Sequence, residues 1–345
     1  SESLQKNIAL VGLLVLIAAN LAQLNGWYVI DLDTKGMLSF SRFGLYANTI
    51  LFVLTFLYLW INAEEIEAIG HQAADFYALF FFILCGASIL TSFDNLLMLF
   101  LGIEILSIPL YILTGADKKN LFSNEAALKY FLMGSFSTGI MLMGIALMYG
   151  ATGNFGMVHS AGLRGAIVAS QQPPYLLVAG VVLLFASMSF KVSAAPFHFW
   201  TPDVYDGTPT VFTSFMATIV KSAGFFAFLK LFEAAFGKFQ ADWQVLMAVV
   251  AALTLVIGNI TAVFQQSVKR MLSYSSIAQA GFMMLGVFAM NIFAKQGMIL
   301  YFAAYSIATI GIFAVLSKFK DHSIDAFNGF SNITRNQHVT SKSIS

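Results

Sequence analysis

Apolar stretches of about 20 residues recur along the chain and are separated by short polar segments. A hydrocarbon layer about 30 Å thick needs roughly 20 apolar helical residues, so each stretch is long enough to cross a bilayer. The strict alternation of polar and apolar positions that is typical of membrane β-strands is absent. The pattern therefore predicts an all-α fold, a polytopic membrane helical bundle of about ten spans. The predicted spans are residues 8–24, 41–61, 75–92, 94–115, 123–150, 175–196, 210–232, 243–263, 270–290 and 297–317.

Polar segments between the spans predict the orientation of the chain, because short cytoplasmic loops are usually enriched in Lys and Arg. The loops on the two sides carry equal numbers of basic residues, and the polar tail at 318–345 decides the bias. We therefore expect both termini in the cytoplasm. The N-terminal side holds Lys6, Lys118, Lys119, Lys269 and Arg270, plus Lys318, Lys320, Arg335 and Lys342 of the tail; the other side holds Lys35, Arg42, Arg164, Lys238 and Lys295.

Composition supports a membrane protein and narrows its chemistry. Of 345 residues, 59% are hydrophobic and 10% charged, against about 25% charged residues in a usual soluble domain. The net charge of +1 and the scattered basic residues predict no nucleic-acid partner. Cys85 is the only cysteine, which disfavours a disulfide framework or an iron–sulfur site. No cleavage site of a signal peptide follows the first span, so we expect that span to be retained.

Three ionisable residues occupy positions deep within predicted spans. Glu104 has about nine apolar residues on either side, Lys191 follows the long run from Tyr175, and Lys221 interrupts its span near the middle. Charged groups at such depth cost about 2.5–3.5 kcal/mol each on insertion scales and usually mark ion paths. We therefore take Glu104, Lys191 and Lys221 as the main candidates for a functional site.

A purely structural interpretation of these charges is a buried ion pair, such as Glu104 with Lys191, that fixes neighbouring helices. One acid does not neutralise two lysines, however, so a lysine remains in excess. A desolvated lysine binds its proton less tightly, and an approaching carboxylate reverses that effect, so a neighbour can switch its proton affinity. This property favours a proton relay.

The segment SFKVSAAPFHFWTPDVYDGTPT begins with this lysine and contains three prolines. Pro196 is expected to stop the helix, and HFWTPDVYDGTP is expected not to continue it, since Pro202 and Pro209 lack amide donors. A break at membrane depth requires protein or water to satisfy the freed carbonyls. His198 is a second-rank relay candidate, because a histidine can pass protons near neutral pH. The alternative, to which we give equal weight, is that His198 only forms a hydrogen bond to a carbonyl freed at the break.

Other polar residues have a simpler interpretation. Asp203 and Asp206 are predicted to be cap or turn residues. The remaining second-rank relay candidates are Lys230, whose position near a span end also fits a snorkelling lysine, and Lys129, which is spaced for an i,i+4 pair with Glu125. The serines Ser273, Ser275 and Ser276 fit helix packing and interhelical hydrogen bonding.

The motifs LFLGIEILSIPLYIL, SFKVSAAPFHFWTPDVYDGTPT, ATIVKSAGF and GNITAVFQQSVKRMLSYSSIAQAGF resemble, in order and spacing, the antiporter-like proton-pumping subunits of respiratory complex I. Within that family the chain is most similar to the subunit N group of NADH:quinone oxidoreductase, over about residues 1–330. The phrase PFHFWTPDVYDG is the most discriminating of these matches.

The resemblance implies a fold with two inverted five-helix repeats, each containing one broken helix. It implies N-terminal spans at 1–74, a first repeat at 75–232 with its broken helix at 175–209, and a partial second repeat at 243–317. It also implies that the family's glutamate is Glu104, its broken-helix lysine Lys191 and its next-helix lysine Lys221.

By the same comparison the family's first helix and last three helices are expected to lack a counterpart here. The lysine that family members carry on the second broken helix would then also lack one, which is the main departure from the family pattern.

Together these observations predict a membrane-arm subunit of a type I NADH:quinone oxidoreductase in the inner (cell) membrane. Protons would move along Glu104, Lys191 and Lys221, with no cofactor or metal in this chain, and NADH and quinone would be handled only by other subunits. The expected partners are other membrane-arm subunits of complex I and the lipid bilayer. The alternatives are a subunit of a cation/proton antiporter or membrane-bound hydrogenase, and a truncated, structural or inactive form.

Overall fold

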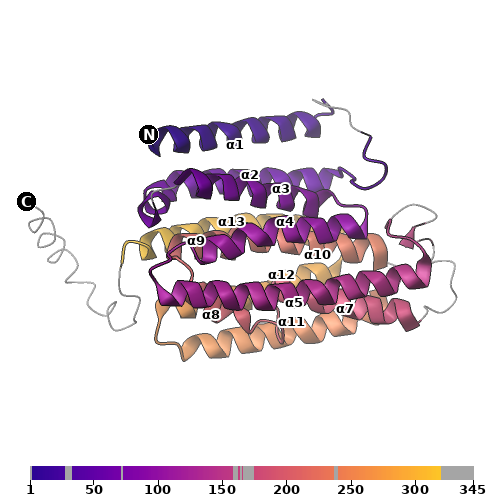
Figure 1. The fold of residues 1–345 in the computed structure, drawn as a ribbon. Coiled ribbons are helices and arrows are strands. Elements are labelled where there is room, and N and C mark those ends of the chain that lie inside the picture. Colours follow the sequence, from indigo (N-terminus) through magenta and orange to yellow (C-terminus); the bar gives the residue numbers. More distant parts are fainter. Residues whose placement is uncertain are drawn as a thin grey trace, which may run out of the picture.

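The computed structural model describes residues 2–27, 33–70, 73–157, 162–163, 165, 175–236 and 240–319. Its long helices lie side by side with nearly parallel axes, so that the connecting segments gather at the two ends of the bundle (Figure 1). The end that holds the N-terminus also holds the start of helix α5 and the end of α13, while the α3–α4 connection lies at the opposite end (Figure 1). This arrangement is the one expected of a multi-pass membrane protein.

Within the described residues, nine helical segments are long and apolar enough to cross a membrane. They are α1 (Glu2–Leu24), α2 (Arg42–Ile69), α3 (Ala73–Ser92), α4 (Leu96–Thr114), α5 (Leu121–Thr152), the segment Thr210–Phe236, α11 (Gln240–Val263), α12 (Val268–Ala289) and α13 (Ile292–Leu316). A tenth apolar helix, α7 (Tyr175–Lys191), is shorter. The all-α prediction is confirmed, and each predicted span corresponds to one of these helical segments.

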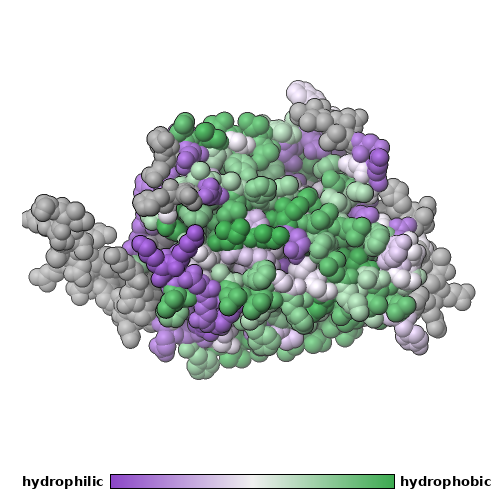
Figure 2. All heavy atoms as spheres, in the orientation of Figure 1, coloured by the Kyte–Doolittle hydropathy of each residue, from purple (hydrophilic) through white to green (hydrophobic). Residues whose placement is uncertain are grey.

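The segment Thr210–Phe236 forms the centre of the bundle. It consists of α9 (Thr210–Phe215), a π-helical turn η1 (Met216–Val220) and α10 (Lys221–Phe236). In its most apolar window 89% of the residues are buried, against 17% for α1 and 28% for both α11 and α13. Lys221 therefore lies on the innermost helix, whereas the outer helices present apolar side chains outwards, consistent with the hydrophobic surface in Figure 2.

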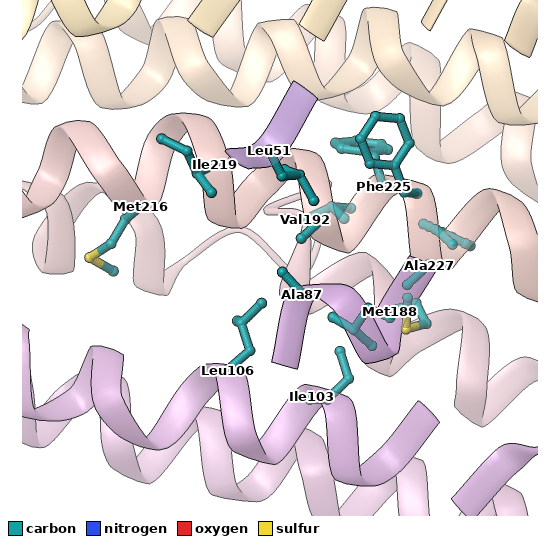
Figure 3. Packing of buried hydrophobic residues seen from close by; sticks show 14 of the residues in the cluster. Leu51, Ala87, Ile103, Leu106, Met188, Val192, Met216, Ile219, Phe225 and Ala227 are labelled. Atoms are coloured by element: carbon teal, nitrogen blue, oxygen red, sulfur yellow. The ribbon is translucent and has the colours of Figure 1, made fainter. Parts of the chain in front are cut away.

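Bulky apolar side chains fill the space around this central helix. Figure 3 shows members of this packing, with Ile103 and Leu106 on α4, Met188 on α7, and Met216, Ile219 and Phe225 on the central segment, and all of these residues are buried. Small residues let other helices approach closely. A Cβ added at Gly86 on α3 would lie 2.6 Å from the backbone nitrogen of Leu106, and one at Gly258 on α11 would lie 2.6 Å from that of Ala278. Close backbone contact of this kind is typical of membrane helix pairs.

The division into inverted repeats at 75–232 and 243–317 stays a prediction. The polar tail predicted at 318–345 lies outside the described residues except for Lys318 and Phe319. Lys318 forms an ion pair with Glu65 and so ties the end of α13 to α2.

Candidate functional site

Glu104 lies near the middle of α4, where the helix carries a polar face. Ser107 follows it by one turn and Tyr111 by two, and Glu104 is near enough to Tyr111 to act on it electrostatically. Pro109 lies inside the same helix and removes the amide that would bond the carbonyl of Ile105. The helix therefore presents a half-buried carboxylate, a hydroxyl and a freed carbonyl within about two turns.

Lys191 is the last residue of α7, and its Nζ donates a hydrogen bond to Ser107 Oγ at 3.1 Å. Glu104 is close enough to act on Lys191 electrostatically, yet no ion pair within 4.0 Å joins them in the described part of the chain. The interpretation of Glu104 and Lys191 as a simple buried ion pair is therefore wrong. Lys191 bonds Ser107 instead, a contact across 84 positions that the sequence did not indicate.

The helix break follows Lys191 directly, five residues before the predicted end at Pro196. Ser193 has φ 64°, the amide of Ala194 bonds the carbonyl of Ser189, and the amide of Ser193 bonds that of Phe190. These two bonds and the left-handed residue form a Schellman cap. Because a proline ring clashes with the carbonyl four positions earlier, Pro196 prevents helical geometry well before its own position.

The protein satisfies part of the opened backbone. Trp200 Nε1 donates to the carbonyl of Phe190 at 3.0 Å, and the amide of Ala195 donates to Thr254 Oγ1 of α11 at 2.9 Å. A cis peptide joins Ala195 and Pro196. The break is thus held between its own downstream helix and α11.

As predicted, HFWTPDVYDGTP does not continue α7; it contains a separate short helix, α8, which spans Trp200–Gly207. Pro202 occupies the first turn of α8, where the amide it lacks would have had no partner within the helix. The proline therefore fits at this position without costing a hydrogen bond.

His198 lies in the break and is buried. Its ring lies near the backbone of Pro196 and stacks on Phe199 at a centroid distance of 5.0 Å, and both interpretations of this residue stay predictions. Four buried polar atoms around the break have no hydrogen-bond partner among the described residues: Ser189 Oγ, Ser193 Oγ, His198 Nδ1 and Thr201 Oγ1. Such atoms are suited to bind water or a moving proton.

Lys221 follows the π-helical turn η1 on the central helix, an element the sequence analysis did not predict. Single π turns are rare and often occur at functional sites. The lysine is 2% exposed, and its Nζ donates to the carbonyl of Ser276 at 2.9 Å and to the hydroxyl of Ser276. One turn later, a Cβ added to Gly224 would lie 3.3 Å from Val192, so α10 approaches the break beside Lys191. The interhelical bonding predicted for Ser276 is confirmed.

Lys129 and Asp203 join an ionic cluster at the N-terminal end of the bundle. Lys129 Nζ lies 2.8 Å from Glu125 Oε1, which confirms the predicted i,i+4 pair, and 2.9 Å from Asp203 Oδ2. Asp203 Oδ1 accepts from Arg270 at 2.9 Å. Burial by itself would raise the pKa of the Asp203 carboxyl, but the hydrogen bonds from Lys129 and Arg270 outweigh burial and hold that pKa below its ordinary value. The cluster joins α5, α8 and α12.

The cap prediction for both aspartates is wrong, because the N-caps of α8 and α9 are Phe199 and Pro209 without side-chain cap bonds. Asp206 Oδ1 instead accepts from Ser267 at 3.3 Å. Buried Lys269 donates to the carbonyls of Asp206, at 2.9 Å, and Thr208. Asp206, Thr208 and Lys269 line a cavity of about 540 Å³ together with Asp117, Asn120, Phe122, Glu125, Ala126, Lys129, Asp203, Gly207, Pro209, Thr210 and Arg270.

Lys230 is separate from this cluster, near the opposite end of α10. Its Nζ donates to the carbonyls of Thr91, at 3.1 Å, and Ser39, at 3.2 Å, and lies 5.4 Å from the ring centroid of Phe93. The amine therefore ties α10 to the α1–α2 connection and to the last turn of α3, rather than extending freely to the interface. The structure brings Glu104 and Lys191 together through Ser107, and it places Lys129 and Lys230 at opposite ends.

No group of three or more His, Cys, Asp or Glu side chains suited to a metal ion occurs in the described ranges. The candidate site consists instead of a carboxylate, the half-buried Lys191, the buried Lys221 and the hydroxyls around them. Apolar membrane-length helices, one broken helix and ionisable groups at mid-span define the class: a multi-pass α-helical membrane protein with an ionisable interior.

The chain belongs to the NADH:quinone oxidoreductase/Mrp antiporter transmembrane family, whose model matches residues 94–341. It is 42% identical over 298 residues to NADH-quinone oxidoreductase subunit N of Cytophaga hutchinsonii, covering 85% of this chain and 64% of that protein. Identity to the subunit N of Flavobacterium psychrophilum is 36% over 328 residues, covering 93% of this chain and 70% of the relative. The chain thus spans about two thirds of the length of these curated relatives.

Solved structures give the same fold. Respiratory complex I from Thermus thermophilus contains a chain that matches with a TM-score of 0.71 and 32% identity, covering 92% of this chain and 65% of that one. The Mrp complex from Dietzia sp. matches with a TM-score of 0.78 at 18% identity, covering 92% and 60% of the two chains, which shows the fold alone. The expectation of an antiporter-like fold is confirmed.

Proposed function

We propose that this chain is a membrane-arm subunit of a type I NADH:quinone oxidoreductase and translocates protons through Glu104, Lys191 and Lys221. Quinone reduction would take place in other subunits, which would be its partners together with the lipid bilayer. The membrane would be the inner (cell) membrane with cytoplasmic termini. The observation that carries the proposal is the pair of lysines at the helix break and after the π turn, neither with a carboxylate within 4.0 Å in the described structure.

The first step of the path involves Glu104 and Lys191. Glu104 is near enough to act on the Lys191 amine electrostatically, and Ser107 accepts a hydrogen bond from that amine at 3.1 Å. A change in the position or protonation of Glu104 would therefore alter how tightly Lys191 holds its proton. A permanent salt bridge would not be switched so easily, because breaking a buried pair is costly.

The second step leads from Lys191 towards Lys221. The break lies between them, and Gly224 lets α10 approach Val192 closely. The buried polar atoms of Ser189, Ser193, His198 and Thr201 are available to bond water along this route. The second-rank relay candidates remain His198, Lys129 and Lys230. Of these, Lys129 belongs to the ionic cluster around Asp203, at the end of the bundle that would face the cytoplasm.

The test is proton pumping by the assembled complex with Glu104→Ala, with Lys119→Ala as the matched control, since Lys119 is exposed in the α4–α5 connection. We expect fewer protons moved per NADH oxidised for Glu104→Ala and an unchanged ratio for the control. Normal pumping in Glu104→Ala and in a Lys191→Ala variant together would contradict the relay.

A second candidate function is a subunit of a cation/proton antiporter, favoured by the fold similarity to the Mrp complex. Sodium-dependent proton movement in vesicles without NADH would support it. Loss of complex assembly on deletion, with unchanged pumping in Lys221→Ala, would instead support a structural role.

A further inference from the structure

The amine of Lys221 donates to Ser276, and two tyrosines from other helices lie near this contact. Ser276 on α12 accepts from it through both its carbonyl and its hydroxyl, and the ring of Tyr205 on α8 lies 5.8 Å from Nζ. Tyr305 on α13 approaches from the far side of Ser276, with its hydroxyl 3.1 Å from Ser276 Oγ. The neighbouring helices α2, α3 and α7 bring no acidic group within 4.0 Å in the described ranges. Tyr205 and Tyr305 are thus the titratable groups that face this amine.

The Tyr305 contact belongs to a polar seam between α12 and α13. One turn away on α13, the hydroxyl of Tyr301 donates to Gln279 Oε1 on α12. Most of the remaining α13 surface is apolar and outward-facing, with Ile307 56% and Ile312 49% exposed. Two polar contacts to α12 one turn apart, on a helix that is mostly apolar, make this seam a candidate for a role beyond packing.

The Ser276 hydroxyl has two lone pairs and a single proton. It accepts from the Lys221 ammonium and from the Tyr305 hydroxyl at the same time, so both lone pairs are occupied and its rotation is restricted. Without Tyr305, the hydroxyl would be free to turn its proton towards the amine or to bond its own helix backbone. The ammonium would then lose a well-oriented acceptor, and its charged form would be less favoured.

We propose that Tyr305 is a positioning residue for proton transfer, which orients the Ser276 hydroxyl and thereby sets how tightly Lys221 holds its proton. The proposal rests on the proposed function, since it concerns the same lysine. It adds α13 to the site, although none of the candidate residues recognised from the sequence lies on that helix.

The test compares Tyr305→Phe with Tyr301→Phe in the assembled complex, measuring proton pumping driven by NADH oxidation between pH 6 and pH 9. Both variants remove one phenolic oxygen from α13, but only the first touches Ser276. The alkaline limit of pumping is the pH at which pumping falls to half its maximum on the alkaline side. We expect this limit to move to lower pH by roughly half a unit to one unit in Tyr305→Phe and to stay in place in Tyr301→Phe. Ser276→Ala should move it at least as far, and Ser276→Thr, which keeps a hydroxyl, should restore it.

Equal pH profiles for Tyr305→Phe, Ser276→Ala and the unaltered complex, with pumping still lost in Lys221→Ala, would overturn the positioning role alone. Unchanged pumping in Lys221→Ala would overturn the proposed function itself. If Tyr305→Phe prevents assembly, the pair Ser276→Ala and Ser276→Thr decides the question, because a merely structural role of the seam would leave the alkaline limit unmoved in both.

Discussion

Replacing Gly144 by alanine should separate α5 from α7, the helix that carries Lys191. The added Cβ would lie 2.9 Å from the carbonyl oxygen of Gly180 and 3.2 Å from the amide of Leu184. Both contacts are with backbone, so rotation of a side chain does not relieve them. The two helices would have to move apart by several tenths of an ångström at the crossing.

The magnitude follows from two opposing effects. Overpacking of a tight contact typically costs about 1–3 kcal/mol. Removing a glycine from a helix interior returns about 0.5–1 kcal/mol through the lower entropy of the unfolded chain. The net expectation for Gly144→Ala is a loss of up to about 2.5 kcal/mol in the free energy of unfolding, with a midpoint of about 1 kcal/mol.

Gly139 provides the matched control on the same helix. A Cβ added there meets nothing within 4 Å, so Gly139→Ala should stabilise the protein by up to about 0.5–1 kcal/mol. The two changes are chemically identical, and only their surroundings differ. The two substitutions should therefore change the free energy of unfolding in opposite directions.

The assay is reversible unfolding of the full chain in mixed detergent micelles, followed by intrinsic tryptophan fluorescence. Proton pumping of the assembled complex should also fall in Gly144→Ala and remain normal in Gly139→Ala, because α7 positions Lys191 against Ser107. Equal stabilisation by the two alanines would refute the close α5–α7 contact, and with it the geometry that we assign to Lys191.

Two further changes test local features of the break and of the ionic cluster. Asp203→Asn should lower the melting temperature at pH 7, since it removes two part-exposed ion pairs worth about 0.2–1 kcal/mol each. The pKa of Asp203 is lowered in the folded protein, so its contribution to stability is present above the ordinary pKa near 3.9 and is lost as pH falls through the folded value. A difference in melting temperature between Asp203→Asn and the unaltered protein that stays constant from pH 7 to pH 3 would contradict this. Ser193→Gly should raise the melting temperature by removing roughly 1 kcal/mol of strain from a left-handed residue, and a decrease would show that the serine hydroxyl matters more than the backbone.

The helical bundle and the depth of Glu104, Lys191 and Lys221 were predictable because they depend on runs of apolar residues that are continuous in sequence. The end of α7 at Lys191 was missed by five residues, since the effect of Pro196 extends backwards along the helix and Ser193 closes a cap that its residue type does not suggest. The π turn before Lys221 has no local signature in MATIV that would distinguish it from an ordinary helix.

The polar partners of the site were beyond the reach of sequence patterns for a different reason. Asp203 looked like a cap because only its neighbours in sequence were visible, whereas its ion-pair partners lie 74 and 67 positions away. Ser107 and Ser276 contact their lysines across 84 and 55 positions. Hydroxyl residues are common in membrane helices, so which of them meets a charge is decided by helix packing.

The most direct test of the account is proton pumping by the assembled complex with Lys191→Arg. Arginine keeps the positive charge and can donate to Ser107, but it does not release its proton in proteins. The measurement is the number of protons moved per NADH oxidised, in complexes with matched subunit content. We expect a clearly lower ratio for Lys191→Arg, because a fixed charge does not replace a proton that must move. A normal ratio would show that Lys191 supplies only charge and would contradict the relay.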